Sequence, residues 1–485
     1  MRPAVSFSAL VLAIALTACS FAPRYKVPET VATPVVYHES GTWKPAQPVD
    51  WQARGPWWTA FGDDDLNALE ARVVPANQDL RAAFARLAQA RAQAHVARSA
   101  LFPTITVGPE VSRTRESKNS SRYQPGTSPL SNDFLLVADA SYELDLWGRV
   151  RNGVRSANAS AQASAADLAT LDLSLHAELA SNYFALRSTD AQVAILDQTV
   201  ADYERAYSLT QNLHKGGAAS ASDIAQARAQ LESAKTQAAD IRLRRAQLQH
   251  AIAVLVGESA SAFEIAPAPA PIGLAPPGLD PGLPSALLER RPDVAAAERR
   301  VAAANADIGV ARAAYFPVFS LAASAGYDST NAQTWIEAPS SLWSLGSSAV
   351  LTAFDAGRHR ALSQQARAVY DETVANYRGS VLDAFREVED NIAAIRQLEQ
   401  EAVSQDAAVD ATQSALQQAN NRYKAGIVTY LEVVTTENAA LQAQLLSRDI
   451  QLRRFVATIQ LVKALGGGWQ PDRIAQANAG NEKHE

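Results

Sequence analysis

The sequence predicts a mainly α-helical chain with a transmembrane β part, assembled from two copies of one structural plan. Three observations predict this fold class. The two halves match each other at a constant offset, each half holds a proline-free helical stretch of about 66 residues, and each half holds two runs that alternate apolar and small side chains. The 485 residues are therefore expected to form long repeated elements, with long helical hairpins joined to pairs of strands.

The segment 1–18 has the layout of a secretory signal peptide. Arg2 precedes an apolar run from Val5 to Leu16 that is too short to span a bilayer. We therefore expect residues 1–18 to be removed on export. Ala13-Ile14-Ala15 offers an ordinary cleavage site as an alternative, although its use would leave a very short apolar core.

Cys19 ends a Leu-Thr-Ala-Cys stretch that resembles the bacterial lipobox, whose cysteine is acylated. Several acyl chains anchor a protein firmly, because each buried CH₂ contributes about 0.8 kcal/mol. Ser20 stands where an aspartate would retain a bacterial lipoprotein in the inner membrane. We expect lipidation at Cys19, with palmitate among the acyl chains, a lipidated N-terminal extension over residues 19–64, and an outer-membrane location.

Three pairs of motifs indicate the duplication, and the offset in numbering is the same in each pair (357 − 148 = 209). The pairs are Gly148 with Gly357, Lys215-Gly216-Gly217 with Lys424-Ala425-Gly426, and Leu255-Val256-Gly257 with Ala464-Leu465-Gly466. Upstream, the Phe-Pro pairs at Phe102 and Phe316 have a slightly larger offset (316 − 102 = 214). A few residues were therefore gained or lost between these motifs, as happens in loops.

The matched halves set the expected domain boundaries. We expect a first repeat at 65–258 and a second at 292–470. Between them, the segment 259–291 contains seven prolines, a density that neither a helix nor a central strand tolerates, so it is expected to be a linker. Residues 471–485 are polar and are expected to form a loosely ordered tail.

Each repeat is expected to contain a long helical hairpin, at 148–257 and at 357–466. In the second hairpin Tyr377, Val381 and Val388 belong to a series with three-and-four spacing, which places it on one helical face. A helix of about 66 residues is about 100 Å long at 1.5 Å per residue, so it needs a neighbour along its whole length. The Ala-rich segments after the glycine turns can supply it by returning antiparallel.

Strands are expected at about 102–146 and 317–355. Phe319, Leu321 and Tyr327 alternate with small residues, and the first half has a similar run around Leu136. Each run alone would also suit a soluble sheet packed on helices. Four strands cannot close a barrel and lipid does not tolerate an open sheet edge, so a membrane sheet requires several chains to share one barrel. Two chains would give eight strands and three would give twelve.

Composition argues against several classes of function. The net charge is −6 with scattered basic residues, which disfavours nucleic-acid binding, and the single cysteine excludes an internal disulfide framework. The seven histidines show no ligand spacing, and neither a nucleophile elbow nor a phosphate loop is present. We therefore expect no enzyme, no catalytic residue, no metal and no cofactor, and we expect the histidines to be solvated or interfacial.

Several motifs together resemble a known family. They include Cys19-Ser20-Phe21-Ala22-Pro23, Trp57-Trp58, Asn77-Gln78-Asp79-Leu80, Leu287-Leu288-Glu289-Arg290-Arg291-Pro292-Asp293-Val294 and Ala464-Leu465-Gly466-Gly467-Gly468-Trp469. The chain resembles the TolC-like outer membrane factors, and in particular the nodulation-T-type lipoprotein branch of resistance-nodulation-division efflux systems. The resemblance extends from Cys19 to Trp469.

This resemblance implies a homotrimer with a long α-helical barrel and a shared 12-stranded outer-membrane β-barrel. It implies that the chain is the exit duct of a tripartite efflux pump and passively conducts exported compounds across the periplasm and the outer membrane. The implied partners are a periplasmic membrane-fusion adaptor and an inner-membrane resistance-nodulation-division pump. A type I secretion exit duct and a periplasmic adaptor or scaffold lipoprotein remain the alternatives.

The resemblance also implies that the two glycine turns are the periplasmic tips that dock on the adaptor. The docking residues expected at these tips are Lys215, Gly217, Ala218, Lys424, Gly426 and Ile427. A helical hairpin needs glycine to reverse direction whether or not a partner binds.

The periplasmic entrance is expected just beyond the second turn. By resemblance, Tyr423 takes part in links between helices and Glu432 forms an acidic ring that attracts cations. Thr435 replaces a second acidic residue of the family pattern. Asp223 is the duplicate of Glu432 and either adds charge nearby or simply caps its helix.

Overall fold

The computed structural model describes residues 20–30, 37–38, 56–121, 123–124, 126, 128–268, 276–277 and 290–467. The expected signal peptide, Cys19 and the polar tail lie outside these residues, as does most of the linker. The chain divides into two compact units, each of which takes segments from both repeats. Unit 1 contains Met1–Glu29, Arg86–Ser164 and Ala296–Tyr377, and unit 2 contains Thr30–Ala85, Ala165–Ala295 and Arg378–Glu485.

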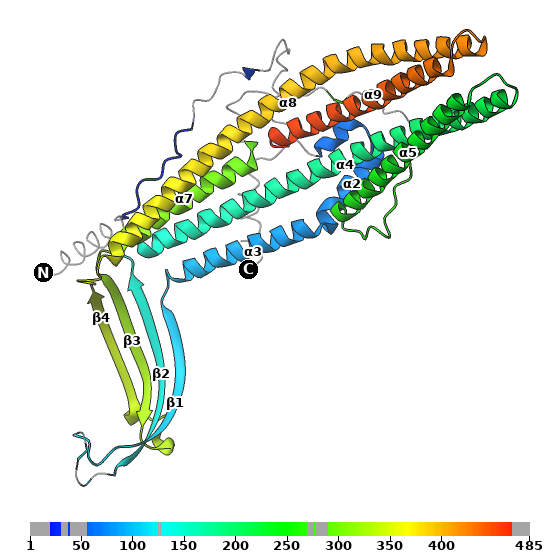
Figure 1. Ribbon diagram of the computed structural model, residues 1–485. Coiled ribbons are helices and arrows are strands. Elements are labelled where there is room, and N and C mark those ends of the chain that lie inside the picture. The colour runs from blue at the N-terminus through cyan, green and yellow to red at the C-terminus, as the bar shows by residue number, and fades with distance from the viewer. Residues whose placement is uncertain are drawn as a thin grey trace. The chain divides into compact units, whose positions relative to one another are not determined.

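Two helical hairpins of equal length dominate the chain (Figure 1). The first consists of α4 (Arg149–Lys215) and α5 (Ala221–Leu255), and the second of α8 (Arg358–Lys424) and α9 (Tyr430–Ala464). The long helices have 67 residues each and the return helices have 35. All four bounds of the second hairpin follow those of the first by the offset of the glycine motifs, so the mainly helical, duplicated fold predicted from the sequence is confirmed.

Among the described residues, four shorter helices precede the strand pairs of the two repeats. They are η2 (Trp57–Phe61), α2 (Asp64–Ala76), α3 (Gln78–Ser99) and α7 (Pro292–Ala313). The carboxylate of Asp63 caps α2 by accepting from the amide of Leu66 at 2.9 Å. The first and last residues of α7 follow those of α3 by 214 positions (292 − 78 = 214). This is the offset between the Phe-Pro motifs that follow these two helices.

The strands form one antiparallel sheet in unit 1, in the order β1-β2-β3-β4. Their bounds are Thr104–Arg115, Leu130–Leu144, Val318–Ser329 and Ser341–Val350, and the short helices η3 (Ala332–Thr334) and η4 (Ala338–Ser340) lie between β3 and β4. β1 and β3 still keep the larger offset of the Phe-Pro motifs, whereas α4 and α8 keep the smaller offset of the glycine motifs. The insertion or deletion therefore falls between the two strands of a pair or directly after them.

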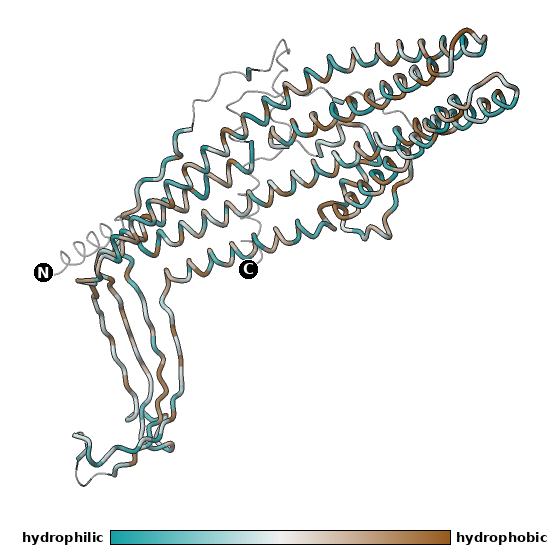
Figure 2. Tube along the Cα trace, viewed as in Figure 1, coloured by the Kyte–Doolittle hydropathy of each residue, from teal (hydrophilic) through white to brown (hydrophobic). Residues whose placement is uncertain are grey.

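Unit 2 has its main apolar core where α2 packs against the hairpins. Leu179, Tyr183 and Leu186 of α4 are buried there together with Ile252 of α5 and Phe455 of α9. In the seam predicted for the second hairpin, Val381 and Val388 are buried in unit 2 and Tyr377 is buried in unit 1. No helix among the described residues is both long and apolar enough to cross a membrane, and Figure 2 shows mixed hydropathy along each helix.

The return helices end in the same way in both repeats. The side-chain amide of Asn77 donates to the carbonyl of Leu255 at 3.0 Å, and the guanidinium of Arg291 donates to the carbonyl of Ala464 at 3.1 Å. Each of these carbonyls belongs to the last residue of its helix and has no partner within the helix, so the side chains satisfy it. Two different residue types therefore perform one structural role at equivalent positions.

Candidate functional site

The sheet of unit 1 has one apolar face and one polar face. Residues directly opposite each other on paired strands share a face, and the register places Ile105, Ala140 and Ala323 in one row. The apolar face consists of alternate residues along each strand, including Ile105, Val107, Val111, Leu136, Phe319, Leu321, Trp343 and Leu345. Many of these side chains are exposed in the single chain, Trp343 to 79%. Such a face must meet lipid or another protein surface.

The opposite face of the sheet carries mainly small polar and acidic residues, together with a few aliphatic ones, namely Leu135, Val137, Val318, Leu342 and Val350. Its acidic members are Glu110, Asp133, Asp139, Glu143 and Asp328, and no strand places a lysine or arginine on this face. Arg113 and Arg115 lie on the apolar face at the far end of β1. Asp139 accepts a hydrogen bond from the Ser324 hydroxyl at 2.5 Å across β2 and β3. Alternating apolar and polar faces are the pattern of strands that separate lipid from a wet lumen.

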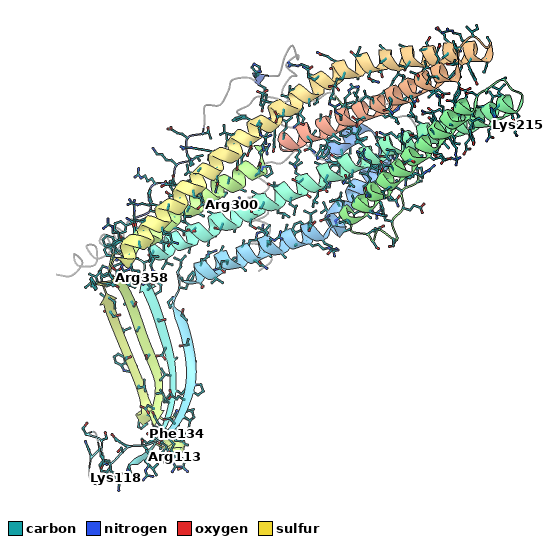
Figure 3. All side chains as sticks on the ribbon, viewed as in Figure 1. Arg113, Lys118, Phe134, Lys215, Arg300 and Arg358 are labelled. Carbon is teal, nitrogen blue, oxygen red and sulfur yellow. The ribbon has the colours of Figure 1, made fainter. Side chains whose placement is uncertain are left out.

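Aromatic side chains flank the apolar face at both of its ends. At the ends that connect to helices lie Phe102, Trp147, Tyr315, Phe316 and Phe354. The Trp147 indole donates to the carbonyl of Pro317 at 2.7 Å, which fixes it between β2 and β3. At the opposite ends lie Phe134, Tyr327, Trp335 and Trp343, and Figure 3 shows Phe134 far from Arg358 at the first turn of α8. Two aromatic belts around an apolar band are typical of a membrane-spanning β-sheet.

The two hairpin turns of unit 2 have the same backbone structure. Ala218 donates to Leu213 at 2.8 Å and Ile427 donates to Arg422 at 2.9 Å. These bonds form a Schellman motif, in which the penultimate turn residue must be left-handed. Gly217 and Gly426 occupy that position with φ of +78° and +72°. The glycines of both predicted tips are therefore explained by the reversal of the chain alone.

All six predicted docking residues are exposed at these turns in the single chain. They are Lys215, Gly217, Ala218, Lys424, Gly426 and Ile427. Figure 3 shows Lys215 at the end of α4. Ile427 is the largest apolar residue among them and is 68% exposed. The turns thus present two lysines and one unburied isoleucine.

The helices after the two turns begin differently. Asp223 and Ser220 form a capping box, in which the Asp223 amide donates to the Ser220 hydroxyl at 3.1 Å and its carboxylate accepts from the Ser220 amide at 2.8 Å. This is the capping role that the sequence left as one of two readings for Asp223. Thr429 precedes α9, and its side chain makes no capping hydrogen bond. Glu432 therefore does not take part in a capping box as Asp223 does.

Glu432 instead forms an ion pair across its turn. Its carboxylate lies 2.6 Å from the Arg422 guanidinium, and both side chains are about half exposed. Thr435 is exposed one helical turn further on and donates its hydroxyl to the carbonyl of Leu431 at 2.8 Å. The sequence reasoning did not anticipate Arg422, although it stands shortly before Glu432 on the facing helix of the same turn.

Tyr423 packs between the two hairpins. Its ring lies 5.6 Å from that of Tyr430 and joins a cluster that includes Tyr207 and Ala227 of the first hairpin. Burial raises the pKa of Tyr423, and Asp223 adds to that rise. The hydroxyl therefore remains protonated and available as a donor at neutral pH.

A second acidic residue lies further along α9, where the hairpins meet. Burial raises the pKa of Glu437 to about 7, and Asp202 of α4 contributes to this rise by repulsion. One carboxylate oxygen of Glu437 and the Tyr203 hydroxyl have no hydrogen-bond partner among the described residues. The two hairpins therefore meet at a carboxyl group that titrates near neutral pH.

His176 corrects the expectation that the histidines are solvated or interfacial. It is 4% exposed and lies 2.5 Å from the fully buried carboxylate of Glu70, with Trp58 stacked on its ring at 4.4 Å. Burial raises the pKa of Glu70 to about 7. Burial alone would lower the pKa of His176, but hydrogen bonds to Asp172 and Glu70 raise it to about 9. Within the described residues no group of His, Cys, Asp and Glu side chains could hold a metal ion.

Comparison with known proteins identifies the family. The model of the family described as "Outer membrane efflux protein" matches residues 73–258 and 283–467. The chain belongs to the outer membrane efflux protein family. The two matched segments contain both hairpins, both strand pairs and both turns described above.

Relatives of this outer membrane efflux protein match along most of its length. The pyoverdine export outer membrane protein OpmQ of Pseudomonas aeruginosa is 34% identical over 86% of this chain and 88% of its own. The outer membrane protein OprJ of the same organism is 32% identical over 99% of each chain. The solved outer-membrane channel OprN is 31% identical, covers 93% of this chain and 100% of its own, and has a TM-score of 0.84.

These findings confirm the predicted family, fold class, outer-membrane location and efflux function. The protein is an outer-membrane efflux channel with the TolC-like fold. Its family is one of channels and not of enzymes. The described sheet and hairpin turns are therefore parts of an efflux channel.

Proposed function

We propose that three copies of this chain form the exit duct of a tripartite efflux pump and conduct exported compounds passively through the outer membrane. One observation carries the proposal, namely the two-faced sheet with aromatic belts at both ends and two unpaired edges. Strands β1 and β4 are those edges. In lipid, every backbone polar group needs a partner, so the edges must pair with other copies. Three copies give a barrel of 12 strands.

The polar face of the sheet would line the lumen of that barrel. Lipid excludes its five carboxylates, so only a water-filled interior can accept them. The ion pair of Arg149 with Glu143 leaves four of these carboxylates without a basic partner on the sheet. Transport through such a lumen needs no chemistry by this chain, and the energy would come from an inner-membrane resistance-nodulation-division pump.

The two hairpin turns would dock on a periplasmic membrane-fusion adaptor. The exposure of Ile427 supports this docking, because covering an exposed apolar side chain with a partner protein is favourable in free energy. We propose that the other exposed residues of the two turns take part in the same docking, namely Lys215, Gly217, Ala218, Lys424 and Gly426. The names of OpmQ and of the toluene efflux pump protein TtgF of Pseudomonas putida point to different compounds, so we place cargo selection mainly in the pump.

A photocrosslinking amino acid at Ile427 tests this assembly in cells. The expected product joins the channel to an adaptor, and its identity leads to the pump. The matched control is the same probe at Val403, which is similarly exposed on α8 but lies about 30 Å before the turn at 1.5 Å per residue. Capture of an adaptor at Val403 and not at Ile427 would contradict docking through the turns.

We propose that the Glu432 carboxylates of the three copies form an acidic ring at the periplasmic entrance, which raises the affinity of the entrance for cations. Thr435 is uncharged and supplies no second acidic ring. Tyr423 would hold the two hairpins together at this level through the cluster that it forms with Tyr207 and Ala227 of the first hairpin. Asp223 caps its helix through Ser220 and keeps its negative charge, so it would add to the same field from the first turn.

The N-terminal assignments complete the proposal. We take residues 1–18 as a signal peptide and Cys19 as the lipidated first residue of the mature extension 19–64. The repeats at 65–258 and 292–470, the linker 259–291 and the tail 471–485 describe the remainder. Because the barrel itself would hold the protein in the membrane, Cys19→Ser is expected to lose labelled palmitate and still give membrane-inserted trimer. Complete loss of insertion would show that the anchor is essential.

A further inference from the structure

Two arginines interrupt the apolar face of the sheet at the far end of β1. On this face the register places Arg113 one row beyond Phe134 and Arg115 two rows beyond it. Both arginines are exposed. Figure 3 shows Arg113 and Phe134 at the end of the sheet away from the helices. The two basic side chains therefore lie just past the aromatic belt at that end, here called the outer belt.

The length of β1 sets the depth of these arginines in the proposed barrel. Nine residue steps separate Thr104 from Arg113 (113 − 104 = 9), which is about 31 Å along an antiparallel strand at about 3.4 Å per residue. With the strand tilted by about 40°, this is about 23 Å along the membrane normal, and the apolar band of such a barrel is about 25 Å tall. Arg113 therefore lies at the border of the band and Arg115 lies among the lipid headgroups, where an arginine costs little.

Charges at this end of the sheet are divided between its two faces. The acidic residues of the strand ends all lie on the polar face, namely Glu110, Asp133 and Asp328. Neither Arg113 nor Arg115 has a hydrogen-bond or ion-pair partner in the part of the chain that the structure describes. Strand β4, which would pair with β1 of the next copy, contains no acidic residue. The strands therefore offer no counter-ion to the two guanidinium groups on the side that meets lipid.

The chemistry of these side chains indicates a phosphate ligand. A guanidinium can donate two parallel hydrogen bonds to one phosphate group. Positions two residues apart on a strand are about 7 Å apart, so each arginine can bind a separate phosphate oxygen. Lys118 is exposed in the loop that follows β1 and adds a third positive charge at this end (Figure 3). Basic groups at a lipid surface attract anionic headgroups in this way.

We propose that Arg113 and Arg115 bind phosphate groups of lipid headgroups in the outer leaflet, with Lys118 adding to the attraction. The inference rests on the proposed membrane barrel, which places the far end of β1 at the cell surface. Phe134 and Trp335 of the outer belt, with ring centroids 5.6 Å apart, offer apolar contact to the acyl chains of the same lipids. The arginines and the belt together would fix the depth of the barrel in the membrane.

The amount of lipopolysaccharide, the phosphorylated glycolipid of the outer leaflet, that stays on the purified trimer tests this site. Arg113→Gln/Arg115→Gln should retain on the order of tenfold less than the wild type, because each exposed charge pair contributes up to about fivefold. Arg113→Lys/Arg115→Lys should retain an intermediate amount, since an ammonium keeps the charge and lacks the planar fork. Arg358→Gln/Arg360→Gln is the matched control, because it removes two exposed charges next to the other end of the sheet.

Only heat-modifiable trimer is compared, so a folding defect cannot be mistaken for lost binding. In mixed micelles the wild type should prefer intact to dephosphorylated lipopolysaccharide, and excess inorganic phosphate should not displace the intact lipid, because its acyl chains add apolar contact. Equal retention by the wild type and the double Gln variant, or equal retention of the two lipids, would overturn the site. Displacement by inorganic phosphate would overturn the assignment to lipid. Absence of any heat-modifiable trimer in the wild type would instead overturn the proposed barrel.

Discussion

The guanidinium of Arg422 lies 2.6 Å from the carboxylate of Glu432 and joins the last turn of α8 to the first turn of α9. Because both groups are about half exposed, the pair stabilises the fold by only about 0–1 kcal/mol. Its larger effect is electrostatic, since Arg422 offsets the charge that Glu432 would otherwise present at the entrance.

Divalent-cation block in planar bilayers should therefore respond in opposite directions to the two partners. Glu432→Gln should weaken block, and Arg422→Gln should strengthen it, because the latter leaves the carboxylate uncompensated. Raising the salt to about 1 M should reduce both differences, since the Debye length falls to about 3 Å. Equal block in the wild type and Glu432→Gln would refute the role of Glu432.

The two turn glycines should tolerate alanine poorly for reasons of backbone conformation. Open space surrounds an added Cβ at both Gly217 and Gly426, so only the positive φ resists it. Each substitution should lower the free energy of unfolding by about 1–2 kcal/mol per chain. Gly216→Ala is the matched control at the same turn, because its φ is not positive. Thermal dissociation of the trimer gives the comparison, and an equal loss in Gly216→Ala would contradict the account.

Arg291→Ala should destabilise the fold more than Asn77→Ala, which removes the equivalent contact at the end of the other return helix. It leaves the carbonyl of Ala464 without its donor and removes two ion pairs, to the partly exposed carboxylates of Asp293 and Glu387, so it should cost more than the loss of one neutral hydrogen bond. Asn77→Ala loses one neutral hydrogen bond, at about 1–3 kcal/mol. Exposed Arg244→Ala should stay within about 0.5 kcal/mol of the wild type. Thermal unfolding in detergent measures all three, and an Arg291→Ala value as small as that of Arg244→Ala would contradict the structure.

Stability should fall as the pH rises through the pKa of Glu437. The folded-state pKa of about 7 lies above the ordinary value of 4.5, so folding favours the protonated form. Its contribution is fully present below about pH 4.5 and is lost as the pH rises through 7. Glu437→Gln should remove this part of the pH dependence and be more stable than the wild type at pH 8. Identical melting curves of the two proteins from pH 5 to 8 would count against it.

Two glycines on the polar face of the sheet should differ sharply in how well they tolerate replacement by alanine. A Cβ at Gly326 would lie 2.0 Å from the carbonyl oxygen of Leu136, whereas Gly346 on the next strand has open space. Gly326→Ala should therefore disturb the pairing of β2 with β3 and reduce membrane-inserted trimer several-fold. Gly346→Ala should insert normally. Heat-modifiable trimer on gels measures both, and equal yields would argue against this register.

Local patterns were sufficient to predict the elements of the fold. The three-and-four spacing around Val381 predicts a buried helical seam, and the Lys-x-Gly motifs that end at Gly217 and Gly426 predict the turns. The alternation around Leu321 predicts a two-faced strand. In each of these cases the signal lies within a few residues along the chain, so no knowledge of distant neighbours is required.

Polar contacts between distant segments could not be read in this way. Glu70 and His176 are 106 positions apart in the sequence, and Pro23 and Asn305 are 282 apart. Neither pair has a spacing or a motif that marks it. Their burial depends on which helix packs against which, as does that of Glu437, so the acidic group at the contact between the hairpins emerged only from the structure.

Reconstitution of the purified protein into planar bilayers tests the central claim most directly. The account predicts a heat-modifiable trimer that inserts and conducts ions in discrete steps, with the ion selectivity changed by Glu432→Gln. A species that becomes soluble once its lipid is removed, and that gives no conductance, would contradict it and would indicate a periplasmic adaptor or scaffold instead.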